Sequence, residues 1–408
     1  MIRTLFSVKG NPKVLLLLEP LNGIPFTLVA PYITLYMQSL GLSDVQIGII
    51  ISVTACFQVF FAFSGGLFTD KFGRKKITIL GDLLGWTIPC LIWAYSQNIW
   101  WFLIAAAFNG FEQVNQTAWV CLMVEDADQN QMVHIWNWIF IAGMLSVFFA
   151  PISGFFVSKG SVVSVMRVLY IIFAISMLIK VIVTWKCAKE TKQGNIRREV
   201  TRTQSIWQMA KGYRQVLTMI IHDKNTVLTF AVVAILACTN VVTSNFFSLY
   251  VTSKLEIPAG LLVVFPIIRA VIVVLTMFLI PKKLEELSIK VPMLMGFMIY
   301  IGCQILLIKC PPGSLSLLII YIIFDAIAFS LVSPRKETML SCYINENERA
   351  RTISLMTAFS FTITIPFGYL TGLLSSINRQ FPFILCLAFY ILITIILATN
   401  KLDKVASS

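Results

Sequence analysis

The stretch F-P-F-I-L-C-L-A-F-Y-I-L-I-T-I-I-L-A-T-N, residues 381–400, decides the fold class of this chain because it contains no charged residue. An α-helix of about 20 apolar residues crosses the roughly 30 Å hydrocarbon layer of a bilayer. Inside lipid only helices and closed barrels satisfy their backbone hydrogen bonds, and barrel strands alternate apolar with polar side chains. This run does not alternate, so it predicts a membrane-spanning helix.

Runs of the same kind recur from one end of the chain to the other. Of the 408 residues, 58% are hydrophobic and 12% are charged, and the mean hydropathy is +0.84. A soluble domain cannot cover its surface with that composition. We therefore predict an all-α membrane protein with twelve transmembrane helices, over roughly residues 14–38, 45–69, 77–96, 99–123, 132–157, 163–186, 225–251, 258–280, 291–309, 315–339, 351–376 and 381–400.

The basic residues predict the orientation of these helices. Twelve spans place both termini on one side, and that side receives 25 of the 32 Lys and Arg residues. The opposite side receives five, and two lie within spans. Because cytoplasmic loops carry the excess of Lys and Arg, we expect a multi-pass protein of the plasma or inner membrane with both termini cytoplasmic. The net charge of +13 is then an orientation signal and a contact to anionic lipid, not a nucleic-acid site.

The longest polar interval divides the chain into two halves. We predict six-helix bundles over 1–187 and 225–408, joined by a cytoplasmic linker, 188–224, in which residues 206–220 form an amphipathic helix. Gly81 and Gly296 are 215 residues apart, and Pro151 and Pro366 share that offset. A shared offset indicates duplication of a six-helix unit, so the two bundles are expected to be pseudo-symmetric.

The loop between spans two and three reads G-L-F-T-D-K-F-G-R-K-K, residues 66–76. It resembles the loop signature of the major facilitator superfamily, G-x-x-x-D-[RK]-x-G-[RK]-[RK], at Gly66, Asp70, Lys71, Gly73, Arg74 and Lys75. The helix count and the two halves extend this resemblance over the whole chain. The segment A-P-I-S-G-F, residues 150–155, is similar to the G-P-x-x-G-G element of drug/proton antiporters, with Ala150 and Phe155 in place of two glycines.

The residue types in the 66–76 loop suit a gate at the cytoplasmic ends of the helices. Gly66 permits close helix approach and Gly73 permits a tight turn. Asp70 can face a helix N-terminus or pair with a cation. Arg74 can bind a carboxylate through two parallel hydrogen bonds. The candidate carboxylates are at the end of span four, Glu125 and Asp126. The resemblance implies that such bonds hold these ends together in one state and break in the other.

Ionisable residues within spans mark candidate functional positions, because each costs about 2.5–3.5 kcal/mol or more at membrane depth. Glu112, Arg269 and Asp325 fall near the middle of their spans. Glu19 and Asp82 fall nearer the ends, where a carboxylate can reach interfacial water. We therefore select the first three as candidates.

Amide side chains accompany these charges. Asn115 and Gln116 follow Glu112 on one helix face, and Asn22 and Asn240 lie in spans one and seven. Hydrogen bonds between helices and a solute cavity both explain such polar stripes. In the superfamily, spans one, four, seven and ten line the central cavity, so the resemblance favours the cavity. Arg269, on span eight, is expected to pair with Asp325 or Glu112.

The predicted function is secondary, proton-coupled transport of a small solute by alternating access, with efflux of drug-like compounds as one form. A carboxyl group at Glu112 or Asp325 would carry the proton, and no G-x-x-x-x-G-K-[ST] nucleotide loop occurs in the sequence. An importer of a sugar or other polar metabolite and a non-transporting membrane sensor stay open. We expect no enzyme activity, since the two histidines are far apart, no cofactor and no metal. The expected partners are the solute, a proton or other coupling ion and the bilayer, with the chain as a monomer.

Overall fold

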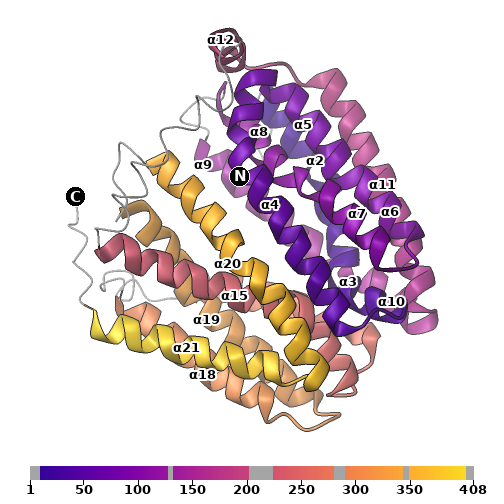
Figure 1. Cartoon of the computed structure of the whole chain (residues 1–408), viewed down its shortest axis with the longest axis vertical. Helices are drawn as coiled ribbons and strands as arrows, with labels where there is room; N and C mark the ends of the chain where they lie inside the picture. Colours follow the sequence, from indigo (N-terminus) through magenta and orange to yellow (C-terminus); the bar gives the residue numbers. More distant parts are fainter. Residues whose placement is uncertain (1–9, 127–131, 202–223, 280–289, 343–348, 401–408) are drawn as a thin grey trace. The chain divides into compact units, whose positions relative to one another are not determined.

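A computed structural model describes residues 10–126, 132–201, 224–279, 290–342 and 349–400, and these residues are helical with no strand among them (Figure 1). They form two compact units. The first holds the described residues within 1–42 and 49–211, and the second those within 43–48 and 212–408. The domain boundaries at 187 and 225 stay a prediction, and the expected amphipathic helix at 206–220 lies outside the described residues.

Twelve membrane-length segments follow one another in the described residues, as predicted. The first six are α2 (Asn11–Val29) with η1 (Ala30–Tyr32) and α3 (Ile33–Ser39), α4 (Asp44–Phe72), α5 (Arg74–Asp82) with η2 (Leu83–Thr87) and α6 (Ile88–Tyr95), α7 (Ile99–Asn109) with α8 (Phe111–Val124), α9 (Met132–Val147) with α10 (Ala150–Lys159), and α11 (Val162–Cys187). The short α12 (Lys192–Val200) follows. The last six are α15 (Lys224–Ser253), η5 (Ala259–Leu261) with α16 (Val264–Leu279), α18 (Lys290–Ile308), α19 (Leu315–Cys342), α20 (Arg349–Ile377) and α21 (Phe381–Thr399).

Eleven of these segments are long and apolar enough to cross a membrane as one helix. The remaining one, expected over 99–123, is divided into α7 and α8 at Gly110. A Cβ at Gly110 would lie 2.7 Å from Cβ of Phe57 and from Cδ2 of Phe61. Glycine at this point therefore lets the segment pack directly against α4.

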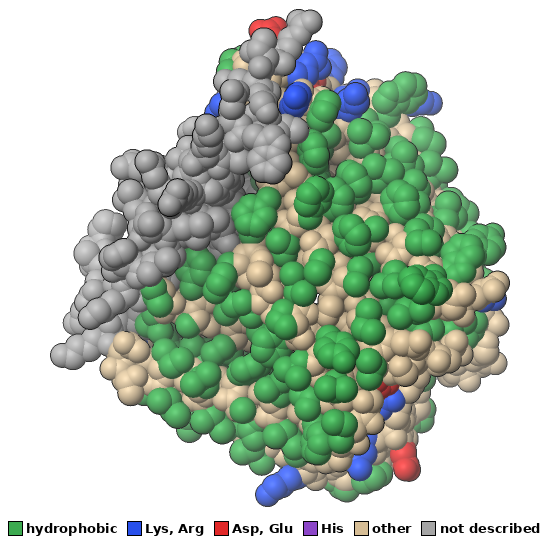
Figure 2. Space-filling model, in the orientation of Figure 1, with side chains coloured by type: hydrophobic (Ala, Val, Ile, Leu, Met, Phe, Trp, Pro, Cys, Tyr) green, Lys and Arg blue, Asp and Glu red, His purple; other side chains and the backbone are tan. Residues whose placement is uncertain are grey.

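The surface of α11 shows that this fold is built for lipid. Its exposed side chains include Val168, Ile172, Ile175, Ile179 and Ile182, which repeat at helical spacing and are each more than 40% exposed. The charged Lys180 on the same helix is 3% exposed. This is the reverse of a soluble helix, and it fits a helix whose outer face contacts hydrocarbon. Figure 2 shows hydrophobic side chains across the displayed face, with Lys and Arg side chains gathered near the ends of the helices.

The internal duplication is visible in equivalent helix crossings. A Cβ at Gly81 of α5 would lie 2.4 Å from Cβ of Asn115 on α8. In the second unit, a Cβ at Gly296 of α18 would lie 2.6 Å from Cγ2 of Val332 on α19. The third segment of each unit thus packs on the fourth through a glycine. This repeated contact is what the duplication predicted from the 215-residue offset requires at this crossing.

Candidate functional site

The loop signature forms a one-residue junction between two helices. α4 ends at Phe72 and α5 begins at Arg74, and Gly73 between them has φ +93°, which favours glycine. The tight turn predicted at Gly73 is therefore confirmed. Gly66 differs from the prediction, because no described atom lies within 4 Å of a Cβ built on it. The neighbouring Gly65 makes the close approach instead, with a Cβ position 3.1 Å from Oγ1 of Thr117.

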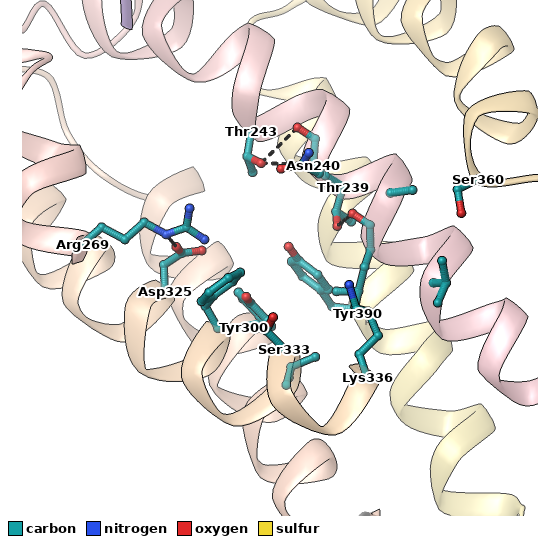
Figure 3. Close-up of a pocket in the computed structure, with 15 residues that line it drawn as sticks. Thr239, Asn240, Thr243, Arg269, Tyr300, Asp325, Ser333, Lys336, Ser360 and Tyr390 are labelled. Atoms are coloured by element: carbon teal, nitrogen blue, oxygen red, sulfur yellow. Dashed lines mark hydrogen bonds and ion pairs between the residues drawn. The ribbon is translucent and has the colours of Figure 1, made fainter. Parts of the chain in front are cut away.

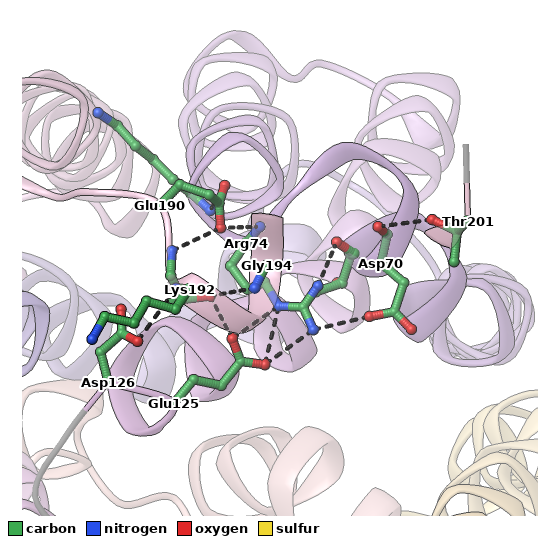
Figure 4. A network of polar contacts seen from close by, with 11 residues as sticks. Asp70, Arg74, Glu125, Asp126, Glu190, Lys192, Gly194 and Thr201 are labelled. Carbon is green, nitrogen blue, oxygen red and sulfur yellow. Dashed lines mark hydrogen bonds and ion pairs between the residues drawn. The ribbon is translucent and has the colours of Figure 1, made fainter. Parts of the chain in front are cut away.

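Arg74 is the centre of a polar network beside this junction (Figure 4). Its side chain is 4% exposed. Nε donates to both carboxylate oxygens of Glu125 at 3.0 Å, and Nη2 lies 3.0 Å from Oε1 of Glu125 and 2.9 Å from Oδ1 of Asp70. The predicted pairing of Arg74 with Glu125 is confirmed. Asp126 does not contact Arg74 in the described residues; it accepts a hydrogen bond from the backbone N–H of Lys192 at 3.3 Å.

The segment after α11 completes this network, and sequence reasoning missed it. Oε1 of Glu190 accepts the backbone N–H of Arg74 at 2.9 Å, and Oε2 accepts that of Lys75 at 3.1 Å. The N–H groups in the first turn of a helix have no acceptor within the helix itself, and Glu190 supplies one for two of them in α5. A negative charge is also favoured at this end of a helix. Thr191 donates to Glu125 and caps α12, and Thr201 at the end of α12 donates to the carbonyl oxygen of Asp70 at 3.2 Å.

The second unit encloses a pocket of about 450 Å³ (Figure 3). Nε of Arg269 on α16 lies 3.0 Å from Oδ2 of Asp325 on α19 inside it. Of the two partners predicted for Arg269, Asp325 and Glu112, the described residues show the contact with Asp325. The guanidinium carbon of Arg269 is also 4.8 Å from the centre of the Phe329 ring, a distance suited to a cation–π contact. The Arg269 side chain is 44% exposed and that of Asp325 14%, so the pair is accessible from the pocket.

Aromatic, aliphatic and uncharged polar side chains, together with one lysine, form the other walls of the pocket. The rings of Tyr300 on α18 and Tyr390 on α21 stack with centres 4.8 Å apart and an interplanar angle of 11°. Asn240 lies on the α15 wall, where its Oδ1 accepts a hydrogen bond from Ser244 at 3.1 Å. Lys336 of α19 also lines the pocket. The volume and mixed lining suit a small organic molecule that has an aromatic ring and one or two polar groups.

The candidate residues of the first unit take different positions. Nδ2 of Asn115 donates to Oδ1 of Asp82 at 2.7 Å, and Asn115 is 7% exposed. The interfacial water expected to reach Asp82 does not do so: Asp82 is 0% exposed and its Oδ1 lies 3.3 Å from Nζ of Lys180. Lys180 is one of the two basic residues within the predicted spans and was not selected as a candidate, although a lysine inside the apolar run 162–187 was a usable signal.

Glu112, Gln116 and Asn22 are not among the residues of the second-unit pocket. Glu112 and Asn22 are half-buried and Gln116 is exposed. The backbone nitrogen of Glu112 packs closely on Gly85, where a Cβ would lie 2.9 Å away. A role of these three residues in a solute cavity stays a prediction. Of the seven predicted binding residues, Asn240, Arg269 and Asp325 are brought together by the structure.

Comparison with known proteins identifies a family to which this chain is similar. The profile of the Major Facilitator Superfamily matches residues 15–334. The multidrug resistance protein MdtG of Escherichia fergusonii is 27% identical over 207 residues, which are 49% of this chain and 50% of that protein. MdtG of Enterobacter lignolyticus is 40% identical over 96 residues, 22% of each protein. The matched stretches therefore span about half the length of these curated relatives or less.

Solved structures match over nearly the whole chain. The nucleoside transporter NupG is similar with a TM-score of 0.71 and 16% identity, covering 96% of this chain and 100% of that one. The xylose transporter XylE from E. coli, in an inward-open conformation, has a TM-score of 0.71 and 14% identity, covering 99% and 98%. At these identities the likeness concerns the fold alone.

Proposed function

Because the chain belongs to the Major Facilitator Superfamily, we propose that this transporter moves a small amphipathic solute by alternating access, driven by a proton gradient. The observation that carries the proposal is the pocket of the second unit. It combines the Arg269–Asp325 pair with the stacked rings of Tyr300 and Tyr390. The pair supplies a charge of either sign, and the rings supply an apolar face for an aromatic solute.

Efflux of drug-like compounds is the form of transport that we favour. The aromatic lining supports it, and so does the similarity to relatives named multidrug resistance proteins. Import of a polar metabolite is the second candidate. Asn240 and Thr239 on α15 favour that alternative, because amide and hydroxyl groups suit a sugar or a nucleoside. A sensor that moves nothing is distinguished from both by the absence of solute flux.

The Arg269–Asp325 pair offers a route to proton coupling. A proton on the Asp325 carboxyl would remove the negative charge that holds Arg269, and Arg269 would then be available to the solute. Glu112 of the first unit is the other candidate carrier, as the sequence predicts. With Asp325 as the carrier, the proton and the solute would compete for the contacts of the Arg269–Asp325 pair, and this competition would couple their binding.

The Arg74 network is proposed as the cytoplasmic gate. Its bonds join α4, α5 and α8 to the segment 188–201 and would hold in one state of the cycle. The excess of Lys and Arg on this side supports a cytoplasmic placement of both termini. Single-cysteine labelling tests the orientation: positions 160 and 198 should react from opposite sides of the membrane. Labelling of both from one side would overturn the topology.

The proposed function is tested with purified protein in liposomes. A thermal-shift screen against drugs, sugars, amino acids and nucleosides selects the solute, and flux of that solute is then measured with and without an imposed proton gradient. We expect gradient-dependent flux of an aromatic cation or zwitterion, and a loss of at least about tenfold in Asp325→Asn. Gradient-dependent flux that is unchanged in both Asp325→Asn and Glu112→Gln would remove both residues as carriers.

A further inference from the structure

The interior of the first unit holds a charge cluster that is separate from the pocket of the second unit. Asp82 on α5 and Lys180 on α11 are 0% and 3% exposed, with Oδ1 and Nζ 3.3 Å apart. Asn115 on α8 donates to the same Oδ1 at 2.7 Å. The second oxygen, Oδ2 of Asp82, is buried with no hydrogen-bond partner among the described residues. Lys180 and Asn115 therefore both donate to Oδ1 of Asp82, and Oδ2 accepts no hydrogen bond from the described residues.

Glu19 on α2 lies at the depth of this cluster. Two sets of hydrogen bonds fix how α2 and α11 align: Asn11 and Lys189 exchange bonds of 2.8 Å, and Ser176 donates to the carbonyl oxygen of Leu21 at 2.6 Å. Glu19 and Lys180 fall between these two contacts. Glu19 also interacts electrostatically with both Lys180 and Asp82. Three helices thus bring two acids and one base together.

The charges of these three side chains do not balance. The single ammonium of Lys180 can neutralise one carboxylate, and Asp82 already holds it. The Glu19 side chain is half-buried, so an ionised Glu19 would then remain as an unpaired charge partly removed from water, which is costly. One proton on Glu19 makes the cluster neutral. Oδ2 of Asp82 has no other partner in the part of the chain that the structure describes, so it can accept a hydrogen bond from the O–H of a protonated Glu19 after a side-chain movement.

We propose that Glu19, Asp82 and Lys180 form a proton-binding site inside the first unit. The proton comes from water, forms an O–H bond with the Glu19 carboxylate, and returns to water when Lys180 turns from Asp82 towards Glu19. A role of this site in a transport cycle rests on the proposed function. The binding of a proton to the site does not. The neighbouring acid that must be distinguished is Glu112, one turn before Asn115 on α8.

An infrared titration of the full chain in lipid tests proton binding without any solute. We expect a carbonyl band of a neutral carboxylic acid that disappears in Glu19→Gln, persists in Glu19→Asp, and appears at a different pH in Lys180→Gln. Glu112→Gln identifies the contribution of the other candidate carrier of the same unit, and Glu199→Gln, at an exposed acid of that unit, is the control. The proposal is overturned if Glu19→Gln leaves the band unchanged, or if Glu112→Gln alone abolishes it.

Flux measurements then separate this site from the proposed function. With the solute found in the screen, Glu19→Gln should retain exchange between equal solute concentrations and lose most of its response to an imposed proton gradient. Full response to the gradient in Glu19→Gln would overturn a coupling role for the site. Absence of flux in the unmodified protein would instead overturn the proposed function, and the infrared result would still decide whether the cluster binds a proton.

Discussion

Glu190 caps the helix that begins at Arg74: its Oε1 accepts the backbone N–H of Arg74 at 2.9 Å, and its Oε2 accepts that of Lys75. Glu190 follows Arg74 by 116 positions in the sequence, and four of the membrane segments lie in this interval. The carboxylate therefore links the polar segment after α11 to the loop that carries the superfamily signature. This link makes the segment 188–201 a structural part of the proposed gate.

We expect Glu190→Ala to destabilise the protein by about 1–2 kcal/mol, because it removes a helix cap and a favourable charge at a helix N-terminus. Glu190→Gln should have a smaller effect. Thermal unfolding measures the loss, and hydrogen exchange should increase over 188–201. Glu199→Gln in α12 is the matched control, since Glu199 is exposed. Equal stability of Glu190→Ala and Glu199→Gln would contradict the cap.

Gly85, where η2 crosses α8, gives a second prediction. A Cβ at Gly85 would lie 2.9 Å from the backbone nitrogen of Glu112, so Gly85→Ala must push two helices apart. We expect a loss of about 1–3 kcal/mol, as for other overpacked interiors. Gly143→Ala on α9 is the control, because no described atom lies within 4 Å of its Cβ position. A thermal shift that is as large for Gly143→Ala would rule out the packing explanation.

The Arg269–Asp325 pair predicts non-additive behaviour. Removing one charge leaves the other unpaired, so Arg269→Gln and Asp325→Asn should each lower stability. The Arg269 side chain is 44% exposed, so solvent can weaken the attraction between the two charges. Each single variant should therefore lose on the order of 1 kcal/mol of unfolding free energy. The double variant should be less destabilised than the sum of the single variants. A double-mutant cycle by thermal unfolding measures this coupling, and strict additivity would argue against the ion pair.

The stacked tyrosines predict which solutes the pocket prefers. Tyr390→Phe keeps the ring that stacks on Tyr300, whereas Tyr390→Ala removes it. An aromatic contact contributes about 0.5–1.5 kcal/mol, so Tyr390→Ala should weaken binding of an aromatic solute about two- to tenfold. Binding of the screened solute to both variants measures the difference. A solute that loses affinity in Tyr390→Phe but not further in Tyr390→Ala would indicate recognition through the hydroxyl, as for a polar metabolite.

The sequence by itself determined the properties that depend on neighbours along the chain. Apolar runs of about 20 residues gave the twelve segments, and the signature loop gave the turn at Gly73, whose φ of +93° favours glycine. The break at Gly110 was not predicted, because a glycine in an apolar run is common in membrane helices and only the approach of Phe57 and Phe61 makes it necessary.

Only the tertiary structure decided which polar side chains meet. Asn115, a candidate for solute binding, donates to Asp82, and Lys180 and Glu190 have partners far away in the sequence. The physical reason is the apolar character of both faces of these helices. On α11, Phe173 and Met177 are buried while Ile172 and Ile175 face outward, so hydropathy does not reveal the direction in which a helix is rotated. That rotation is set by packing between helices, and it determines where each charge lies.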